Sequence, residues 1–134
     1  MGIVQSSMVA TGRARRTLYM DTRVGTYDIT KAEAEDATLV VEMVPVFDGE
    51  TVVQLEVIST DISTGADITL DVGDGDNDDL FSPTALTIGQ AGGSSGIIAG
   101  GGKSYSVNDT LDISILVAAT TGAAGTLTMI AVLA

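Results

Sequence analysis

ITLDVGDGDNDDLF, from Ile68 to Phe81, is the stretch around which the rest of the chain is organised. Its first residues alternate between apolar and polar side chains, which is the two-residue period of a strand with one buried face. The alternation then gives way to glycines and acids, which favour turns over strands. The stretch therefore predicts a strand over 67–72 that ends in an acidic loop.

The same alternation recurs on both sides of this stretch, in segments separated by Gly, Asp, Asn and Pro. Residues 31–35 favour a helix of one or two turns. The two C-terminal strands are separated by a turn of small residues over 120–125, and we expect them to form a hairpin. Together these patterns predict an all-β fold, either an antiparallel β-sandwich or a jelly-roll-like barrel. The strands are expected over 17–19, 24–27, 39–44, 51–59, 86–88, 103–107, 110–118 and 126–133.

The domain organisation follows from length and local composition. A chain of 134 residues is the size of a single domain and buries enough surface for a core of its own. We expect an extended basic N-terminal arm over 1–27 and a single β-sandwich domain over 28–134. Within this domain, residues 90–102 contain six glycines and predict a long surface loop.

Charge is distributed unevenly along the chain. Residues 1–31 carry five basic and two acidic side chains, a net charge of +3, whereas the remainder has one lysine against sixteen acids, a net charge of −15. A folded domain with this much negative charge repels nucleic acids and anionic membranes at long range. Nor does any run approach the roughly 18 apolar residues of a membrane span. We expect neither nucleic acid nor membrane as a partner.

The absence of two residue types narrows the chemistry. The chain has no His and no Cys, which excludes Ser-His-Asp and Cys-His catalytic groups, disulfides and thiolate metal sites. Asp109 and Asp112 resemble the carboxylate pair of a glycosidase, but the chain has no Trp and few aromatic residues to hold a sugar. We therefore expect a protein that is not an enzyme.

The acidic loop has a carboxylate density that suits calcium, a cation that takes six to eight oxygen ligands. Its spacing departs from a calcium-binding EF-hand loop, because the sixth position counted from Asp74 is Asp79 instead of Gly and the twelfth is Ala85 instead of Glu. The loop is either a calcium site or a solvated acidic turn, and we favour the turn, with no cofactor. The metal ligands of the first alternative would be Asp71, Asp74, Asp76 and Asp78.

The order of segments from residue 36 to residue 134 resembles the capsid decoration, or cement, proteins of tailed bacteriophages. This sequence departs from the group in its additional Arg-rich first segment and in a loop that is unusually rich in glycine. Its elements are ITLDVGDGD over 68–76, LF at 80–81, the Gly/Ala-rich loop, the Tyr-containing segment 103–107, NDTLDI over 108–113, and a turn through 121–122 before the last apolar strand.

The resemblance implies a structural virion protein that binds the outside of the capsid and cross-bridges neighbouring major capsid subunits. It also implies a homotrimer on the capsid surface. Alternatives are a neck, tail or head-fibre-base protein of the virion, or a calcium-dependent binding module. Residues 130–133 are apolar on both faces of the last strand, which indicates that one face packs against a neighbouring subunit. The residues expected to contact the capsid are Arg13, Arg15, Arg16 and Arg23. The alternative is that these arginines only add solubilising charge.

Overall fold

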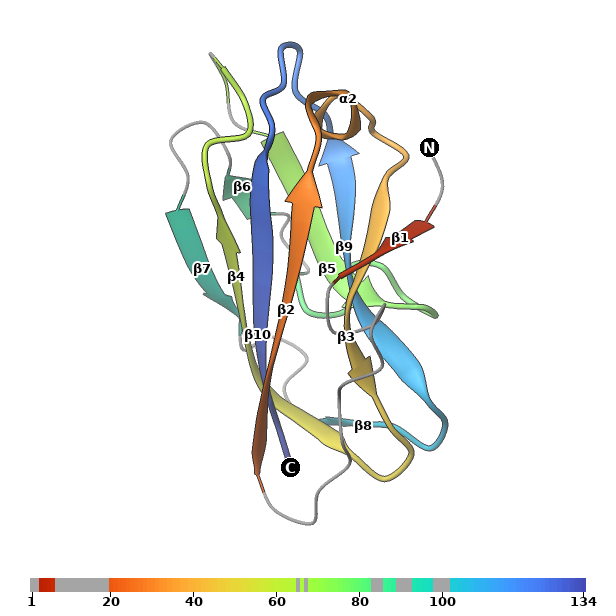
Figure 1. Ribbon diagram of the computed structural model, residues 1–134. Coiled ribbons are helices and arrows are strands. Elements are labelled where there is room, and N and C mark those ends of the chain that lie inside the picture. Colours follow the sequence, from red (N-terminus) through yellow and green to blue (C-terminus); the bar gives the residue numbers. More distant parts are fainter. Residues whose placement is uncertain are drawn as a thin grey trace.

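The computed structural model describes residues 3–6, 20–64, 66, 68–82, 86–88, 93–97 and 102–134. These residues form two sheets that pack face to face (Figure 1). Sheet A has the strand order β1 (Ile3–Gln5), β3 (Val40–Val46), β9 (Asp109–Val117), β5 (Ile68–Asp74) and β6 (Leu86–Ile88). Sheet B has the order β2 (Asp21–Ile29), β10 (Gly125–Leu133), β4 (Thr51–Ser59) and β7 (Gly93–Ile97), and the short β8 (Lys103–Ser104) also pairs with β4.

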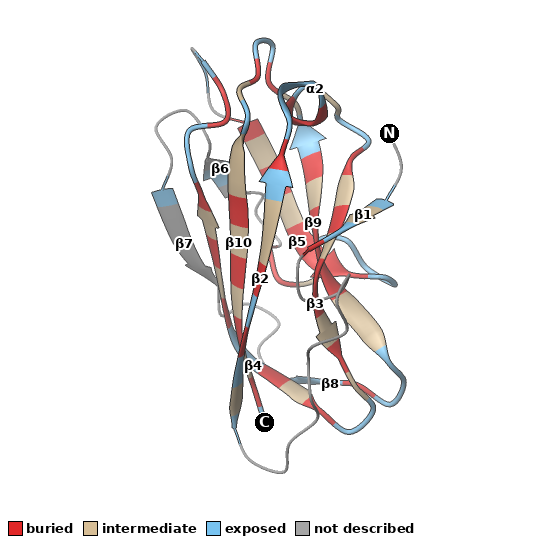
Figure 2. Ribbon diagram, in the orientation of Figure 1, coloured by how far each residue is buried: buried red, intermediate tan, exposed pale blue. Residues whose placement is uncertain are grey.

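The core lies between the two sheets. Residues of the long strands point alternately inward, most regularly in β10, which alternates between buried and partly exposed positions from Thr126 to Leu133 (Figure 2). The predicted sandwich is thereby confirmed. The largest buried side chains are almost all aliphatic, as expected for strands rich in β-branched residues and leucine. They include Ile29, Leu39, Met43, Leu55, Ile62, Ile68, Leu70, Phe81, Leu111, Ile113 and Leu127.

The chain changes sheets at almost every step between consecutive strands. From β2 to β5 each strand lies in the sheet opposite the one before it, and only β5 and β6 are direct neighbours in one sheet. This alternation places strands that are consecutive in sequence on opposite sides of the core. The predicted hairpin of the last two strands is wrong, because β9 pairs with β3 and β5 whereas β10 pairs with β2 and β4. The small-residue turn instead carries the chain across the core, a role that its composition allows equally well.

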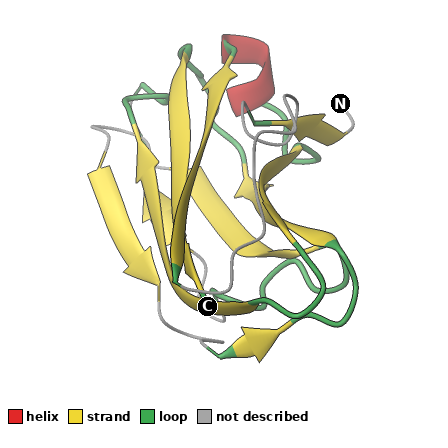
Figure 3. Ribbon diagram, turned by 60° about the horizontal axis from the view of Figure 1, so that its bottom comes forward, coloured by secondary structure: helices red, strands yellow, loops and turns green. Residues whose placement is uncertain are grey.

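A single helical turn, α2 (Lys31–Ala34), closes one end of the sandwich, as predicted, and the C-terminus lies at the other end (Figure 3). Thr30 and Glu33 form a reciprocal capping box. The Tyr27 hydroxyl donates to Glu33, and burial together with this bond raises the pKa of Tyr27 to about 12. In the part of the chain that the structure describes, no helix is long and apolar enough to cross a membrane.

Two predicted boundaries need correction. β2 begins at Asp21 and pairs with β10 along nine positions, so residues 21–27 belong to the sandwich and not to an arm. Residues 93–97, predicted as loop, form β7 because the backbone of β4 offers a complete pairing edge from Leu55 to Ser59. Glycine and serine have little strand preference of their own, so only the partner strand could reveal this segment. The predicted strand 17–19 lies outside the described residues.

β2 passes close to sheet A at Gly25. A side chain there would place its Cβ 2.0 Å from the Met43 carbonyl oxygen and 2.9 Å from the Ser6 hydroxyl. Ser6 follows β1, donates its hydroxyl to the Met43 carbonyl, and donates its backbone N–H to Glu42 at 2.7 Å. The absence of a side chain at Gly25 therefore lets β1, β2 and β3 meet and closes one side of the sandwich.

Candidate functional site

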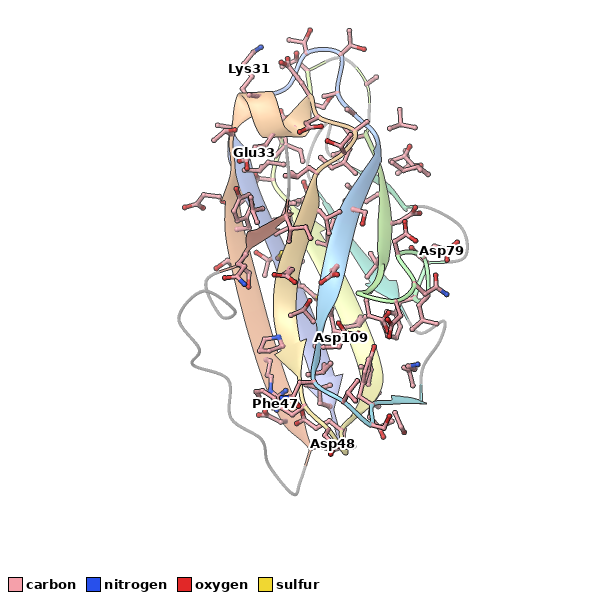
Figure 4. The ribbon with its side chains drawn as sticks, turned by 90° about the vertical axis from the view of Figure 1, so that its right-hand side faces the viewer. Lys31, Glu33, Phe47, Asp48, Asp79 and Asp109 are labelled. Atoms are coloured by element: carbon pink, nitrogen blue, oxygen red, sulfur yellow. The ribbon has the colours of Figure 1, made fainter. Side chains whose placement is uncertain are left out.

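The outer face of sheet A carries a groove of about 260 Å³ between β1 and the loop that follows β5. Its floor consists of cross-strand pairs in which Glu42 lies opposite Asp112 and Val40 opposite Ser114. Figure 4 shows Asp79 on the projecting acidic loop and Asp109 on the neighbouring strand β9. The full lining is Ile3, Val40, Glu42, Asp74, Gly75, Asp76, Asn77, Asp78, Asp112 and Ser114.

Two carboxylates on the groove floor share one hydroxyl group. The Thr110 Oγ1 lies 2.7 Å from Asp112 Oδ1 and 3.2 Å from Glu42 Oε2, and its single proton can satisfy one of them at a time. Burial raises the pKa of Asp112 to about 7, because the Thr110 bond only partly offsets it and the charges of Glu42, Asp109 and Asp74 add to it. Gln5 of β1 donates to Glu42 at 3.1 Å. The raised pKa lets Asp112 keep its proton to a higher pH than an exposed carboxyl group, and the bond from Gln5 to Glu42 adds a side-chain contact between β1 and β3.

Asp74 organises the acidic loop from within. It is buried at the end of β5, and its Oδ1 accepts the backbone N–H groups of Asp76 and Asn77, each at 3.0 Å. Its Oδ2 accepts the Tyr105 hydroxyl at 2.8 Å. Burial raises the pKa of Tyr105, and the bond to Asp74 raises it further, so the hydroxyl stays protonated and keeps donating. Asp74 therefore fixes the shape of the turn.

Asp109 holds the same loop from the neighbouring strand. Its Oδ1 accepts the backbone N–H groups of Gly75 at 3.2 Å and Thr110 at 2.7 Å. A Cβ on Gly75 would lie 2.7 Å from that oxygen, so the glycine lets the loop approach β9. The loop is thereby joined to β9 through a carboxylate that the metal prediction did not include.

The carboxylates that come together differ from the predicted metal set. Among the described residues, Asp74, Asp76 and Asp109 bring carboxylate oxygens within 4.8 Å of one another. Asp71 and Asp78 are not part of this group. Asp71 lies on the outer face of β5, where burial and the charges of Asp79 and Asp78 raise its pKa. The sequence analysis did not group Asp109 with the loop acids, because its closeness to Asp74 and Asp76 depends on the pairing of β5 with β9. The sequence did indicate that Asp109 lies in a turn just before a strand.

The donor set fits a hydrogen-bonded turn better than a calcium cage. Calcium takes six to eight oxygen ligands, so three carboxylates fill the site only if each binds through both of its oxygens or other ligands contribute. Both Asp74 oxygens and Asp109 Oδ1 already accept backbone or hydroxyl protons. These hydrogen bonds fix the shape of the acidic turn.

Arg23 lies in an internal ion pair and not on the exposed surface. Its side chain is 2% exposed, its Nη2 is 2.5 Å from Glu50 Oε2, and its Nε is 2.9 Å from Asp21 Oδ2. It also donates to the Pro45 carbonyl at 2.9 Å and stacks 5.0 Å above the ring of Phe47, at the end of the sandwich opposite α2 (Figure 4). Arg23 therefore cannot reach a partner in this structure, and the interpretation of it as a contact residue is corrected. Arg13, Arg15 and Arg16 lie outside the described residues.

Comparison with solved structures finds the same fold in chains of two bacteriophage capsids. A chain in the structure "Capsid of Ralstonia phage GP4" is 24% identical with a TM-score of 0.75, over 98% of this chain and 97% of that one. A chain in "Cyanophage Pam1 capsid asymmetric unit" is 18% identical with a TM-score of 0.61, over 91% of this chain and 94% of that one. No protein-family model and no curated protein sequence matches the chain. At these identities the likeness establishes a shared fold.

Proposed function

We propose that the chain is a structural protein of a bacteriophage virion that binds the outside of the capsid and stabilises it by cross-bridging neighbouring major capsid subunits. The observation that carries the proposal is the similarity to a chain of the Ralstonia phage GP4 capsid, which extends over nearly the full length of both chains. The Pam1 capsid chain adds a second case of the same fold in the same setting. The partners are the major capsid protein and further copies of this chain, with a homotrimer as the expected assembly.

The internal chemistry of the described residues suits a structural and non-enzymatic role. The buried polar groups are engaged in holding strands and turns, as in the Arg23–Glu50 ion pair and the Asp74–Tyr105 hydrogen bond. A protein that cross-bridges a shell needs a rigid body and contact surfaces, and it needs no reactive group. The sandwich supplies the rigid body.

We further propose that Arg13, Arg15 and Arg16 contact the shell. They form the one basic cluster of a chain with a net charge of −12, and they lie between β1 and β2 in sequence. Acidic groups on a partner repel the acidic sandwich, but they attract a basic segment of the same chain.

The test is to mix the purified chain with shells of its phage that were assembled without it, and to count the bound copies. The wild type is expected to bind in a fixed ratio to the capsid subunit. The variant R13Q/R15Q/R16Q is expected to bind at least about tenfold more weakly, a loss that corresponds to about 1.4 kcal/mol. Substitution of the arginines is preferable to deletion of residues 1–16, because a deletion would also remove residues 3–6, which hydrogen-bond to β3.

The matched control is D76N/D78N, which alters two exposed acids of the loop and is expected to bind like the wild type. Absence of wild-type binding to every shell form would overturn the proposed function. Normal binding of the triple arginine variant would overturn the assignment of the contact residues alone. A neck, tail or head-fibre-base position would instead show labelled chain at one vertex or on the tail of intact virions.

The grouping of Asp74, Asp76 and Asp109 favours a calcium-dependent binding module as the second candidate. This alternative requires that about 1 mM calcium raise the melting temperature and that a chelator reverse the rise, because a ligand that binds only the folded state stabilises it. A melting temperature that is the same in calcium and in chelator would rule out the calcium-dependent module.

A further inference from the structure

The short strand β1 lies at the margin of the fold. It has three residues and, among the described strands, pairs only with β3 at the edge of sheet A (Figure 1). Ile3 and Gln5 are exposed, and Val4, the one side chain of β1 that packs against the core, is itself only partly buried. Removal of β1 from this edge would therefore expose little apolar surface.

The edge of β3 that β1 covers fits this particular sequence. Gln5 lies opposite Glu42 and donates its side-chain amide to that carboxylate at 3.1 Å. Ser6, which is buried, donates its backbone N–H to the Glu42 carbonyl at 2.7 Å and its hydroxyl to the Met43 carbonyl. The segment that fits this edge is thus residues 3–6, and every copy of the chain carries it. A second copy of the chain can therefore occupy the edge as well as the chain itself does.

The connection from β1 to β2 contains more residues than its end points require. Ser6 and Met20 are fourteen positions apart in the sequence. Ser6 lies beside Gly25, and Gly25 and Met20 are five positions apart, which is about 17 Å along a strand. The connection therefore has to span about 20 Å, whereas fourteen residues reach about 46 Å when fully extended.

The reach of this connection exceeds the width of the domain. A compact domain of 134 residues has a radius of gyration of about 14 Å, which corresponds to a sphere about 36 Å across. The connection is thus long enough for β1 to reach the β3 edge of an adjacent copy. The contacts that β1 forms there are the same as those it forms with its own chain, so the exchange costs little energy and depends on how close the copies are.

We propose that β1 is exchanged between copies of the chain, so that residues 3–6 of one copy pair with β3 of the next. The inference rests on the proposed function for the homotrimer and for the shell that brings copies together. The contact is head-to-tail, because a strand of one copy meets a different surface on its neighbour, and such contacts close into a ring of three. The exchanged segment has no charged side chain, so the acidic neighbour does not repel it.

Pairs of cysteines across the two strands test the proposal, because the chain has no cysteine of its own. Q5C/E42C and I3C/V40C each replace two residues that lie directly opposite each other on β1 and β3. Each variant is equilibrated in solution and on shells, and the cysteines are then joined by oxidation or by a short bismaleimide. The denatured, unreduced product is expected to contain covalent trimers. In solution their share is expected to fall at least about fivefold between about 200 µM and about 2 µM protein, by mass action.

The matched control is V40C/S114C, whose positions lie opposite each other on β3 and β9, two strands that each have a neighbour on both sides. It is expected to link only within one copy. Equal linking between copies in the control would overturn the proposal, because the links would then come from collisions. Test variants that link only within one copy, in solution and on shells, would overturn it as well. Covalent species larger than a trimer would support the exchange but contradict the homotrimer. Exchange in a chain that does not bind shells would refute only the capsid role.

Discussion

At the scale of single residues, buried charges fix one end of the sandwich. Arg23 contacts Asp21, Glu50, the Pro45 carbonyl and the ring of Phe47, and Glu50 also accepts the Phe47 backbone N–H at 2.7 Å. These contacts join the first residues of β2 to the turn between β3 and β4. An ion pair without access to water is costly to break from one side, since the remaining charge stays buried.

Substitution of Arg23 by Met is expected to lower the free energy of unfolding by about 3–5 kcal/mol, because Glu50 is left without its cation. Urea denaturation measures the change. In a double-mutant cycle, R23M/E50Q is expected to lose less than the sum of R23M and E50Q. The control is K31M, which removes a Lys31–Glu35 pair whose lysine is 62% exposed, and its change should stay within about 0.5 kcal/mol. Equal effects of R23M and K31M would contradict a structural role for the buried pair.

Asp112 makes the stability depend on pH. Its pKa is about 7 in the folded protein, against an ordinary value of 3.8, so between about pH 4 and pH 7 the folded state retains a proton that the unfolded chain releases. The free energy of unfolding therefore falls as the pH rises through this window. D112N keeps an acceptor for Thr110 but does not titrate. It is expected to match the wild type at pH 4 and to exceed it by about 1–2 kcal/mol at pH 8, less than the full pKa shift because water in the groove screens the charge.

Urea denaturation from pH 4 to pH 8 measures this difference, with D61N as a control at an exposed turn carboxylate. A D112N variant whose stability follows the wild type at every pH would show that Asp112 does not retain the proton.

The candidate site could be predicted from the sequence only in part. Asp76 lies in the loop where it was expected, and Asp74, expected in the same loop, is the last residue of the strand before it. Asp109 joins them from another strand 33 positions further along the chain, and Arg23 is buried by contacts with a distant turn. Local patterns contain neither contact, because both depend on which strands pair and where the turns meet.

At the scale of strands, Gly25 governs how closely the two sheets approach at one edge. A Cβ at this position would lie 2.0 Å from the Met43 carbonyl oxygen, a backbone atom that cannot move alone. G25A is therefore expected to displace β2 from β3 and to lower the free energy of unfolding by about 2–4 kcal/mol. Thermal and urea unfolding measure the loss, and T22A, at an exposed position of the same strand, should change it by less than about 0.5 kcal/mol. A neutral G25A would mean that the strands can separate at no cost.

Most strands could be predicted because their alternation is local. β4 and β6 have the expected bounds, and β10 begins one residue earlier than expected. β5 continues two residues beyond Val72, where Gly73 packs against the returning loop and Asp74 caps it. The partners of β9 and β10 could not be predicted, since alternation shows that a strand has an inward face and not which sheet it joins.

At the scale of the whole molecule, the sandwich presents an acidic face on sheet A, and the net charge of the chain, −12, acts against compactness. Mutual repulsion among exposed carboxylates destabilises a folded protein and is weakened by salt. Raising NaCl from about 10 mM to about 500 mM shortens the screening length from about 30 Å to about 4 Å. The melting temperature is therefore expected to rise by about 4 °C, which corresponds to about 1 kcal/mol for a domain of this size.

D76N/D78N/D79N provides the matched comparison, because it removes three exposed acids of one loop and leaves the buried Asp74 in place. With less repulsion to screen, this variant is expected to melt higher than the wild type at low salt and to gain less from added NaCl. Melting is followed by circular dichroism at low protein concentration, so that association between copies of the chain does not contribute. Equal salt dependence in the variant and the wild type would show that these three loop acids do not contribute to the repulsion.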